Sequence, residues 1–326
     1  MSWQDNQAPD GSPIGAPIGS SEKQVSTSTN SLFGAPNGGA HTGTTPERQR
    51  RKQRMKSHVL EEIAAGLSDR EFAILRSVAE HQFLTVRQVE ALHFADHAPG
   101  VGDRLARRSL AKLRRQRLLG ALSRRIGGVR AGSAGMVHYV DAIGQQLLNK
   151  RSGRRPRGFR EPSQRFVNHR VAVAGTHVTL VEADREACLE LVECYVEPTS
   201  WRRFPGIGGA RLTLKPDLYA ETALPSDSDL VHAWFVEVDL GTESIPTLLK
   251  KCRDYESYRR TGIEQDHDGS FPLVVWSMTH AEAAKAIQRR LALQDAIDAD
   301  RSLTSKLFRV IAPDQLVPLL ARGGAI

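Results

Sequence analysis

The spacing of apolar residues predicts that order begins near Leu67, with three helices in succession. The stretch LSDREFAILRSVAEH has apolar residues at helical spacing, and Ser68 followed three residues later by Glu71 is the pattern of a capping box. FLTVRQVEALHF predicts a short second helix capped by Thr85, and DRLARRSLAKLRRQRLL a third helix capped by Asp103. The three amphipathic helices predict a small packed unit.

A β-hairpin is predicted directly after the third helix. LGALSRRI (119–126) and MVHYV (136–140) are strand-like segments, and the glycine-rich stretch between them predicts a hairpin tip. DAIGQQLLNK then predicts a short closing helix. Three helices followed by a hairpin is the order of a winged helix, which is a variant of the helix-turn-helix.

From Ser163 onward the pattern changes to an α/β alternation. After a long helix capped by Ser163, the pattern predicts strands at 189–198, 210–221 and 232–241, a helix with Pro246 in its first turn, a strand at 271–278 and a helix capped by Thr279. This αβββαβα order indicates an α/β domain with a central mixed sheet.

Composition divides the chain further. The first 45 residues are rich in Gly, Ser, Pro, Thr and Asn and lack an apolar period, which predicts a disordered tail, and a basic run follows at 47–56. The Arg/Gly/Pro-rich stretch KRSGRRPRGFREP is typical of a linker. We therefore expect a tail at 1–56, a winged-helix domain at 57–150, a basic linker at 151–162 and an α/β domain at 163–326.

Cysteine usage and hydropathy favour a cytoplasmic protein. Cys188, Cys194 and Cys252 form no CxxC pair, which suits a reducing compartment and predicts no zinc site. The N-terminus does not have the pattern of a secretory signal, and no window of 18 apolar residues predicts a membrane span. A membrane partner is therefore not expected.

The net charge of +8 is unevenly distributed. Residues 57–160 carry 19 Lys and Arg against 9 Asp and Glu, whereas residues 161–326 carry 19 against 24. The basic middle of the chain predicts a polyanionic partner. A solvated basic surface is the alternative.

The third predicted helix carries its charge on one side, which favours double-stranded DNA as the partner. Ala106, Leu110 and Leu113 fall on one helical face, and no acidic residue follows Asp103 in the helix. The opposite face carries Arg104, Arg108, Lys112 and Arg115. In a winged helix this helix enters the major groove, and the wing touches the flanking backbone. The predicted wing adds Arg124, Arg125 and Arg130.

Two carboxylates interrupt an apolar strand in WFVEVDLGTES. Glu237 and Asp239 are two residues apart, so on a strand they point to the same side. Like charges on an apolar strand are costly unless a metal ion, a basic group or solvent compensates them. The function of this half of the chain depends on which of the three does so.

The segments LKPDLYAE, FVEVDLGTES and LLKKCRDYESY, in this order behind a winged helix, resemble the replication-relaxation family of plasmid and mobile-element proteins. The resemblance covers roughly residues 67–320. The α/β half, with Lys215-Pro216-Asp217 and Glu237-Val238-Asp239, resembles the PD-(D/E)xK nuclease-like fold. These resemblances imply a role in DNA replication, relaxation or mobilisation, with replication or mobilisation proteins as partners.

The nuclease resemblance also implies a candidate site. An active nuclease of that fold holds Mg²⁺ with two carboxylates, and a lysine two residues on stabilises charge at the phosphate. Asp217 and Glu237 match the carboxylates, Asp239 stands where the lysine would be, and Lys251 or Lys215 could replace it. The implied catalytic set is Asp217, Glu237, Asp239 and Lys251, with the three carboxylates as magnesium ligands. In the alternative, a degenerate site, Lys251 and nearby arginines neutralise the carboxylates.

Three functions remain open at this point. The first is a DNA-binding protein of replication or relaxation with a degenerate nuclease-like domain. The second is a magnesium-dependent endonuclease. The third is a transcriptional regulator whose second domain dimerises or binds an effector. Convergence of the three carboxylates with Lys251 pointing at them would favour the endonuclease, and carboxylates that splay to solvent or pair with arginines would count against it.

Overall fold

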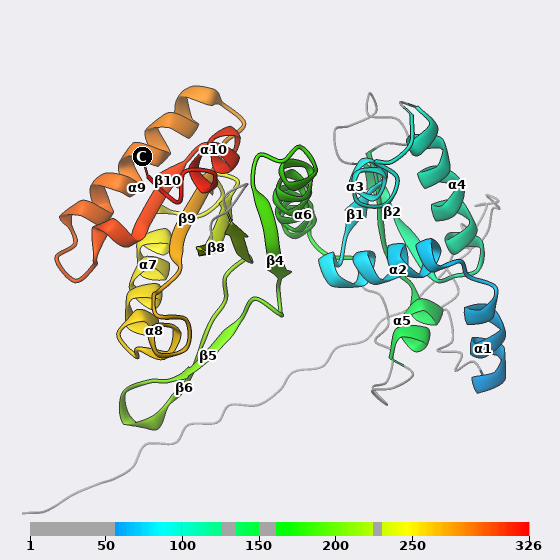
Figure 1. The fold of residues 1–326 in the computed structure, drawn as a ribbon, viewed down its shortest axis with the longest axis horizontal. Helices are drawn as coiled ribbons and strands as arrows, with labels where there is room; N and C mark the ends of the chain where they lie inside the picture. The colour runs from blue at the N-terminus through cyan, green and yellow to red at the C-terminus, as the bar shows by residue number, and fades with distance from the viewer. Residues whose placement is uncertain (1–55, 99, 126–134, 150–160, 224–229, 326) are drawn as a thin grey trace, which may run out of the picture. The chain divides into compact units, whose positions relative to one another are not determined.

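The computed structural model describes residues 56–98, 100–125, 135–149, 161–223 and 230–325. Its first part holds α1 (Ser57–Ala65), α2 (Asp69–His81), β1 (Leu84–Thr85), α3 (Val86–His93), α4 (Val101–Arg115), β2 (Leu119–Arg125), β3 (Met136–Val140) and α5 (Ala142–Leu148). The three strands form an antiparallel sheet in the order β1-β3-β2 (Figure 1). The predicted hairpin is therefore present, and its tip lies outside the described residues.

Local capping positions two of the helices of this part as predicted. Ser68 and Glu71 form the capping box of α2, and Thr85 forms one with Gln88 at α3. The predicted Asp103 cap was wrong, because α4 begins at Val101 behind Gly100, whose φ of 79° is accessible to glycine without strain. The predicted start near Leu67 was late, since α1 precedes it.

The second part is a layered α/β arrangement. It contains α6 (Gln164–Arg185), β4 (Glu190–Val196), β5 (Arg202–Pro205), β6 (Arg211–Leu214), β7 (Leu218–Ala223), β8 (Val231–Asp239), α7 (Ile245–Arg259), α8 (Ile263–Asp268), β9 (Leu273–Met278), α9 (Ala283–Ala299), β10 (Phe308–Ile311) and α10 (Leu316–Leu320). Five strands pair in the order β10-β9-β8-β7-β4, with β8, β9 and β10 parallel and the other pairings antiparallel. The expected α/β class with a central mixed sheet is thus confirmed.

Opposite faces of this sheet bury different helices. Trp234, Val236 and Val238 of β8 share a core with α6 and α10, whereas Phe235 of β8 packs with Tyr255 of α7 and with α9. The alternation along β8 follows from the two-residue period of a strand. Glu237 and Asp239 have the parity of Phe235, so they lie on the α7/α9 side.

Two expectations for this part were wrong. The predicted strand 210–221 is divided into β6 and β7 by Lys215, Pro216 and Asp217, because proline cannot donate a ladder hydrogen bond. β6 instead pairs with β5 in a separate two-stranded ribbon. The predicted Thr279 cap lies too early, since α9 begins at Ala283 behind Glu282. Strands β5 and β10 and helices α8 and α10 were not anticipated.

Helix α6 contacts both parts of the fold. Ala174 lies in the core of the first part, whereas Val173 and Leu180 lie in the core beside the sheet. A helix that is apolar on more than one side is buried between two layers. Polar contacts add to this packing, because Gln88 Nε2 donates to Val171 O at 2.8 Å and the imidazole of His81 stacks on that of His177 at 5.0 Å.

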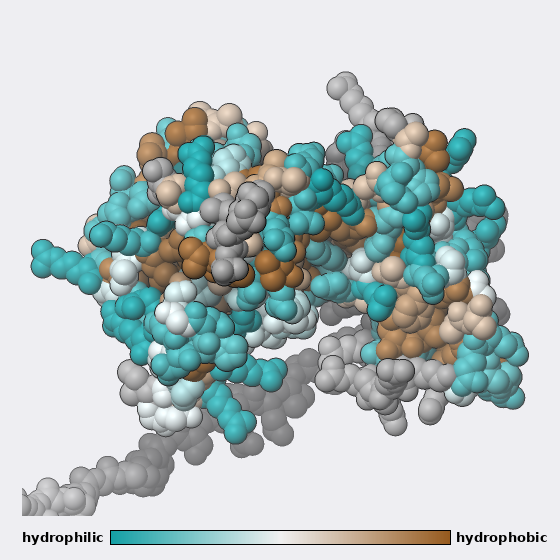
Figure 2. Space-filling model, viewed as in Figure 1, coloured by the Kyte–Doolittle hydropathy of each residue, from teal (hydrophilic) through white to brown (hydrophobic). Residues whose placement is uncertain are grey.

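The surface differs from these cores in polarity. Figure 2 shows a largely hydrophilic face with apolar patches between the polar side chains. Ile287 and Leu291 of α9 are among the exposed apolar residues. Within the described ranges, every helix is too short or too polar to cross a membrane.

The His81–His177 pair should reduce the stability of the protein as the pH falls from 7 to 5. His81 Nε2 lies 2.7 Å from His177 Nδ1, and burial lowers the pKa of both, that of His177 to about 4. The unfolded chain therefore binds protons that the native state does not. The stability from these neutral imidazoles is present above about pH 6.5 and is lost as the pH falls towards 4. At pH 5 one such group favours unfolding by about 2 kcal/mol, measurable by urea unfolding.

The matched variant is His81→Phe/His177→Phe, which keeps two stacked rings but no titrating nitrogen. It should lose less stability than the wild type between pH 7 and pH 5. An unchanged pH dependence in this variant would show that the pair does not carry the effect.

Candidate functional site

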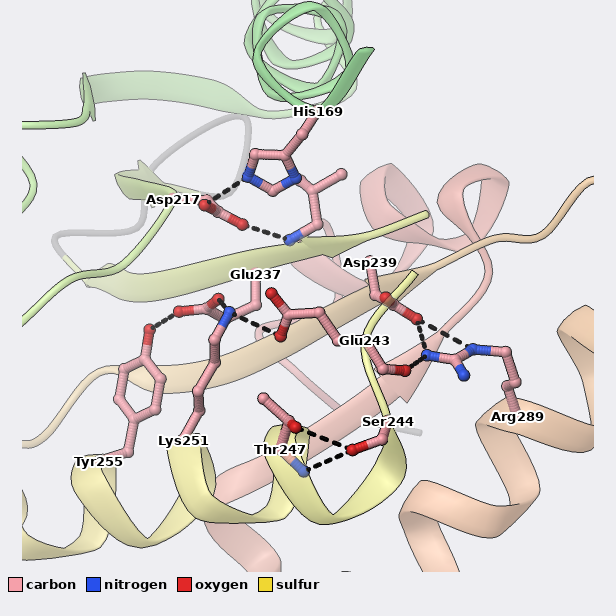
Figure 3. Close-up of polar contacts among 11 residues, drawn as sticks. His169, Asp217, Glu237, Asp239, Glu243, Ser244, Thr247, Lys251, Tyr255 and Arg289 are labelled. Atoms are coloured by element: carbon pink, nitrogen blue, oxygen red, sulfur yellow. Dashed lines mark hydrogen bonds and ion pairs between the residues drawn. The ribbon is translucent and has the colours of Figure 1, made fainter. Parts of the chain in front are cut away.

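The break between β6 and β7 places Asp217 at the start of β7 beneath α6. Asp217 is 5% exposed, and each of its carboxylate oxygens accepts one hydrogen bond. His169 Nε2 of α6 lies 2.9 Å from Oδ1, and the backbone N–H of Val238 donates to Oδ2 at 2.9 Å (Figure 3). The carboxylate therefore links the helix on one face to the centre of the sheet.

Glu237 is compensated by α7. Its carboxylate is buried, accepts a hydrogen bond of 2.6 Å from the Tyr255 hydroxyl, and lies 3.5 Å from Lys251 Nζ. Tyr255 and Lys251 are four residues apart, so they project from the same face of α7. Ser244 caps this helix by accepting from the backbone N–H of Thr247 at 3.3 Å, which fixes where the helix begins.

Asp239 is compensated by α9 instead. Arg289 donates to Asp239 Oδ2 at 2.7 Å and 3.2 Å, and it also donates to the backbone carbonyl of Glu243 at 2.8 Å. The Glu243 side chain in turn lies 3.3 Å from Lys251 Nζ. Figure 3 shows Lys251 between the carboxylates of Glu237 and Glu243, with Asp239 turned towards Arg289.

Protein groups therefore compensate these carboxylates. In the part of the chain that the structure describes, no group of three His, Cys, Asp or Glu side chains is arranged to hold a metal ion. Lys251 approaches the carboxylates, as anticipated for a replacement lysine, and Asp239 pairs with an arginine, as anticipated for a degenerate site. The magnesium site formed by Asp217, Glu237 and Asp239 stays a prediction.

Burial shifts the pKa values of Glu237 and Lys251 in opposite directions, because it disfavours the charged form of each group. Burial, followed by the charge of Asp217, raises the pKa of Glu237 to about 8, although Lys251 and Tyr255 lower it. Burial lowers the pKa of Lys251, but the facing carboxylates raise it above its usual value. The two partners respond differently because the Glu237 side chain is 3% exposed and that of Lys251 is 37% exposed. Burial thus favours the protonated form of Glu237, whereas the facing carboxylates favour the charged form of Lys251.

His169 adds a second group able to carry positive charge. Burial lowers the pKa of its imidazole, but the hydrogen bond and charge of Asp217 raise it above the usual value. A protonated imidazole and an ammonium beside carboxyl groups can bind an anionic group and exchange protons with it. The arrangement is thus chemically capable of both anion binding and acid–base work.

Three partners in this site escaped the sequence interpretation. These partners are His169, Tyr255 and Arg289. Their hydrogen bonds to the carboxylates join residues 48, 18 and 50 positions apart. Pairs this far apart in the sequence cannot be predicted from local spacing. Only the four-residue spacing of Lys251 and Tyr255 could be recognised in the sequence, because it places both side chains on one face of a helix.

Helix α4 buries one face and exposes arginines on the other. Ala106, Leu110 and Leu113 are buried, as their spacing predicts. Three arginines on the opposite side are exposed and have no ion-pair partner among the described residues: Arg104, Arg108 and Arg115. This face can accept an external anion without first breaking an internal pair.

Other basic residues of this part are already engaged or are not described. Lys112 Nζ lies 2.7 Å from Glu71 Oε2 and donates to the Gly66 carbonyl at 3.2 Å, so it joins α4 to α2. The side chains of Arg124 and Arg125 on β2, and all of Arg130, lie outside the described residues. Contact of these four residues with DNA stays a prediction.

Comparison with known proteins identifies the family. The replication-relaxation family model matches residues 75–274, and the chain belongs to this family. The match includes α4, Asp217 and strand β8, which carries Glu237 and Asp239. No curated protein and no solved structure matches the chain.

Replacing Lys251 by Met should make the protein less stable at alkaline pH. Loss of the ammonium raises the pKa of Glu237 further, so the native state keeps a proton that the unfolded chain releases near pH 4.5. Stability then falls as the pH rises, because the native state binds more protons. Since Lys251 is 37% exposed, solvent screens part of the effect, and we expect a loss of about 1–3 kcal/mol at pH 9.

The control is Lys251→Met/Glu237→Gln, in which no carboxylate is left without its cation. Urea unfolding at pH 7 and pH 9 should show a smaller pH dependence in the double variant than in Lys251→Met. Equal pH dependence in the two variants would contradict the coupling.

Proposed function

We propose that this protein binds duplex DNA through α4 and acts in the replication or mobilisation of a plasmid or mobile element. The observation that carries the proposal is the face formed by Arg104, Arg108 and Arg115. Arginine donates to phosphate oxygens and, in a bidentate manner, to guanine edges. A helix that is merely solvated usually mixes both signs of charge along its face.

The surrounding elements support this use of α4. The order α2, α3, α4 and then the β2–β3 hairpin is that of a winged helix, in which the third helix enters the major groove. Lys112 favours a defined position for α4 through its ion pair with Glu71. Membership of the replication-relaxation family favours a replication role over general transcriptional regulation.

The triple variant Arg104→Ala/Arg108→Ala/Arg115→Ala should bind duplex DNA much more weakly and with less salt dependence. Each lost phosphate contact lowers the slope of log K against log salt by about 0.9, so three contacts lower it by about 2.7. The measurement is fluorescence anisotropy of a labelled duplex across a salt series.

The matched control is Lys285→Ala/Arg301→Ala/Lys306→Ala, which removes the same charge from exposed positions on α9 and the segment after it. It should leave the salt slope close to that of the wild type. If the α4 variant behaves like this control, the duplex does not bind at α4.

A second candidate function is metal-dependent phosphodiester cleavage at the buried carboxylates. It is favoured by the contact between Lys251 and Glu237 close to Asp217. Each carboxylate can accept more hydrogen bonds or ligands than those described, so Asp217 and Glu237 could hold Mg²⁺ or Mn²⁺. Asp239 is engaged by Arg289, which favours two carboxylate ligands over three. Lys251 would then stabilise charge that develops on the phosphoryl oxygens.

Metal binding and cleavage can be tested together. Mg²⁺ or Mn²⁺ should raise the melting temperature of the wild type, because a ligand at a hundredfold excess over its Kd adds about 2.7 kcal/mol. Supercoiled plasmid should be nicked, and Asp217→Asn should lose both the thermal shift and the nicking while it retains duplex binding. A melting temperature indifferent to millimolar metal, with intact plasmid, would leave the carboxylates as a structural cluster.

A further inference from the structure

The two-stranded ribbon of β5 and β6 is separate from the five-stranded sheet. Arg203 pairs with Thr213 and Pro205 with Arg211 in an antiparallel register. Figure 1 shows the two strands running away from the sheet, with their connection at the far end. At that connection Gly208 has a φ of 69°, a conformation for which glycine is favoured. The ribbon therefore presents backbone and side chains beyond the main layers.

One face of the ribbon is anchored in the core. Phe204 is buried, and its ring centroid lies 5.0 Å from that of Tyr258. Arg202 donates to Glu264 Oε1 at 2.8 Å and places its guanidinium 4.4 Å from the Tyr219 ring centroid. Packing and a half-buried ion pair together hold the base of the ribbon in a defined position.

The other face is basic and exposed. The alternation of the strands places Arg203 and Arg211 on this face, away from Phe204, and exposed Lys215 directly follows β6 with its ammonium 4.9 Å from the Trp201 ring centroid. None of the three has an ion-pair partner among the described residues. Residues 199–216 contain four basic and no acidic residues. This contrasts with residues 161–326 as a whole, in which 24 acidic residues outnumber 19 basic ones.

The basic face ends at the candidate site. Lys215 lies two residues before Asp217, and Ser200 Oγ donates to the Pro216 carbonyl at 2.6 Å, which ties the two ends of the ribbon together. A phosphate backbone that approaches the buried carboxylates meets repulsion from an acidic domain, and a basic arm at that point offsets it. The major groove of DNA also has room for a two-stranded β-ribbon.

We propose that the ribbon is a second DNA-contacting element, whose Arg203, Arg211 and Lys215 meet the phosphates of duplex DNA beside the Asp217 site. The proposal rests on the duplex binding proposed above and extends it from α4 to the α/β part of the chain. Phosphate contacts of this kind position the duplex and carry no direct sequence information. The ribbon thus sets where DNA lies relative to the carboxylates.

The first test is the full-length variant Arg203→Ala/Arg211→Ala/Lys215→Ala, with anisotropy measured on the same labelled duplex. Loss of three phosphate contacts lowers the salt slope by about 2.7. The Lys285→Ala/Arg301→Ala/Lys306→Ala variant is the charge-matched control and should keep the wild-type slope. If the ribbon variant keeps the wild-type salt slope, as this control should, the proposal is wrong.

The second test locates the contact directly. Thr213 is exposed on the basic face opposite Arg203, so Thr213→Cys carrying a photo-crosslinker should join to duplex DNA. Cys188 is exposed, and Cys188→Ser therefore serves as the background, with the same protein lacking Thr213→Cys as the blank. Crosslinking no greater than the blank contradicts the proposal even if affinity has changed.

The outcomes separate this proposal from the proposed function. If the salt dependence of duplex binding falls in the α4 variant but not in the ribbon variant, α4 alone binds the duplex and the ribbon inference fails. If the salt dependence falls in the ribbon variant but not in the α4 variant, the duplex binds to the α/β part and the α4 proposal fails. A wild type that does not bind duplex DNA overturns both.

Discussion

The burial of three carboxylates constrains how the sheet and its helices are put together. Asp217, Glu237 and Asp239 are each at most 5% exposed, and an uncompensated buried charge costs several kcal/mol. Their compensating groups come from three helices: α6 for the first, α7 for the second and α9 for the third. Both faces of the sheet must therefore be covered before the charges are satisfied, which couples the site to assembly of the α/β layers.

Much of the fold could be predicted because it is encoded locally. Ser68 with Glu71, Thr85 and Ser163 each act within one helical turn, and each caps the helix predicted for it. The failures arise where tertiary pairing decides. β10 is a four-residue strand held by β9, and β5 exists only as the partner of β6. The α4 start depends on the backbone freedom of Gly100 rather than on a side-chain cap.

The candidate site was only half predictable for a related reason. The two-residue spacing of Glu237 and Asp239 fixes that both point to one side of β8, and this side is the one covered by α7 and α9. That spacing does not specify their partners, since Asp239 pairs with Arg289 fifty residues away and Glu237 with Tyr255 eighteen residues away. Adjacent carboxylates on one strand thus acquire different environments, one shared with Lys251 and Tyr255 and one held by an arginine.

The basic groups are distributed differently in the two parts of the fold. On α4 the core is apolar and three arginines remain available, so the helix can bind a polyanion without rearrangement. In the α/β part the lysine and arginine nearest the carboxylates are already paired, so an approaching phosphate gains little from them and is repelled by the acidic surroundings. Binding of a phosphate near these carboxylates then requires unpaired basic groups that lie outside the site. The basic face of the β5–β6 ribbon, with Arg203, Arg211 and Lys215, lies next to Asp217 in the chain. We propose that this face attracts the phosphate there.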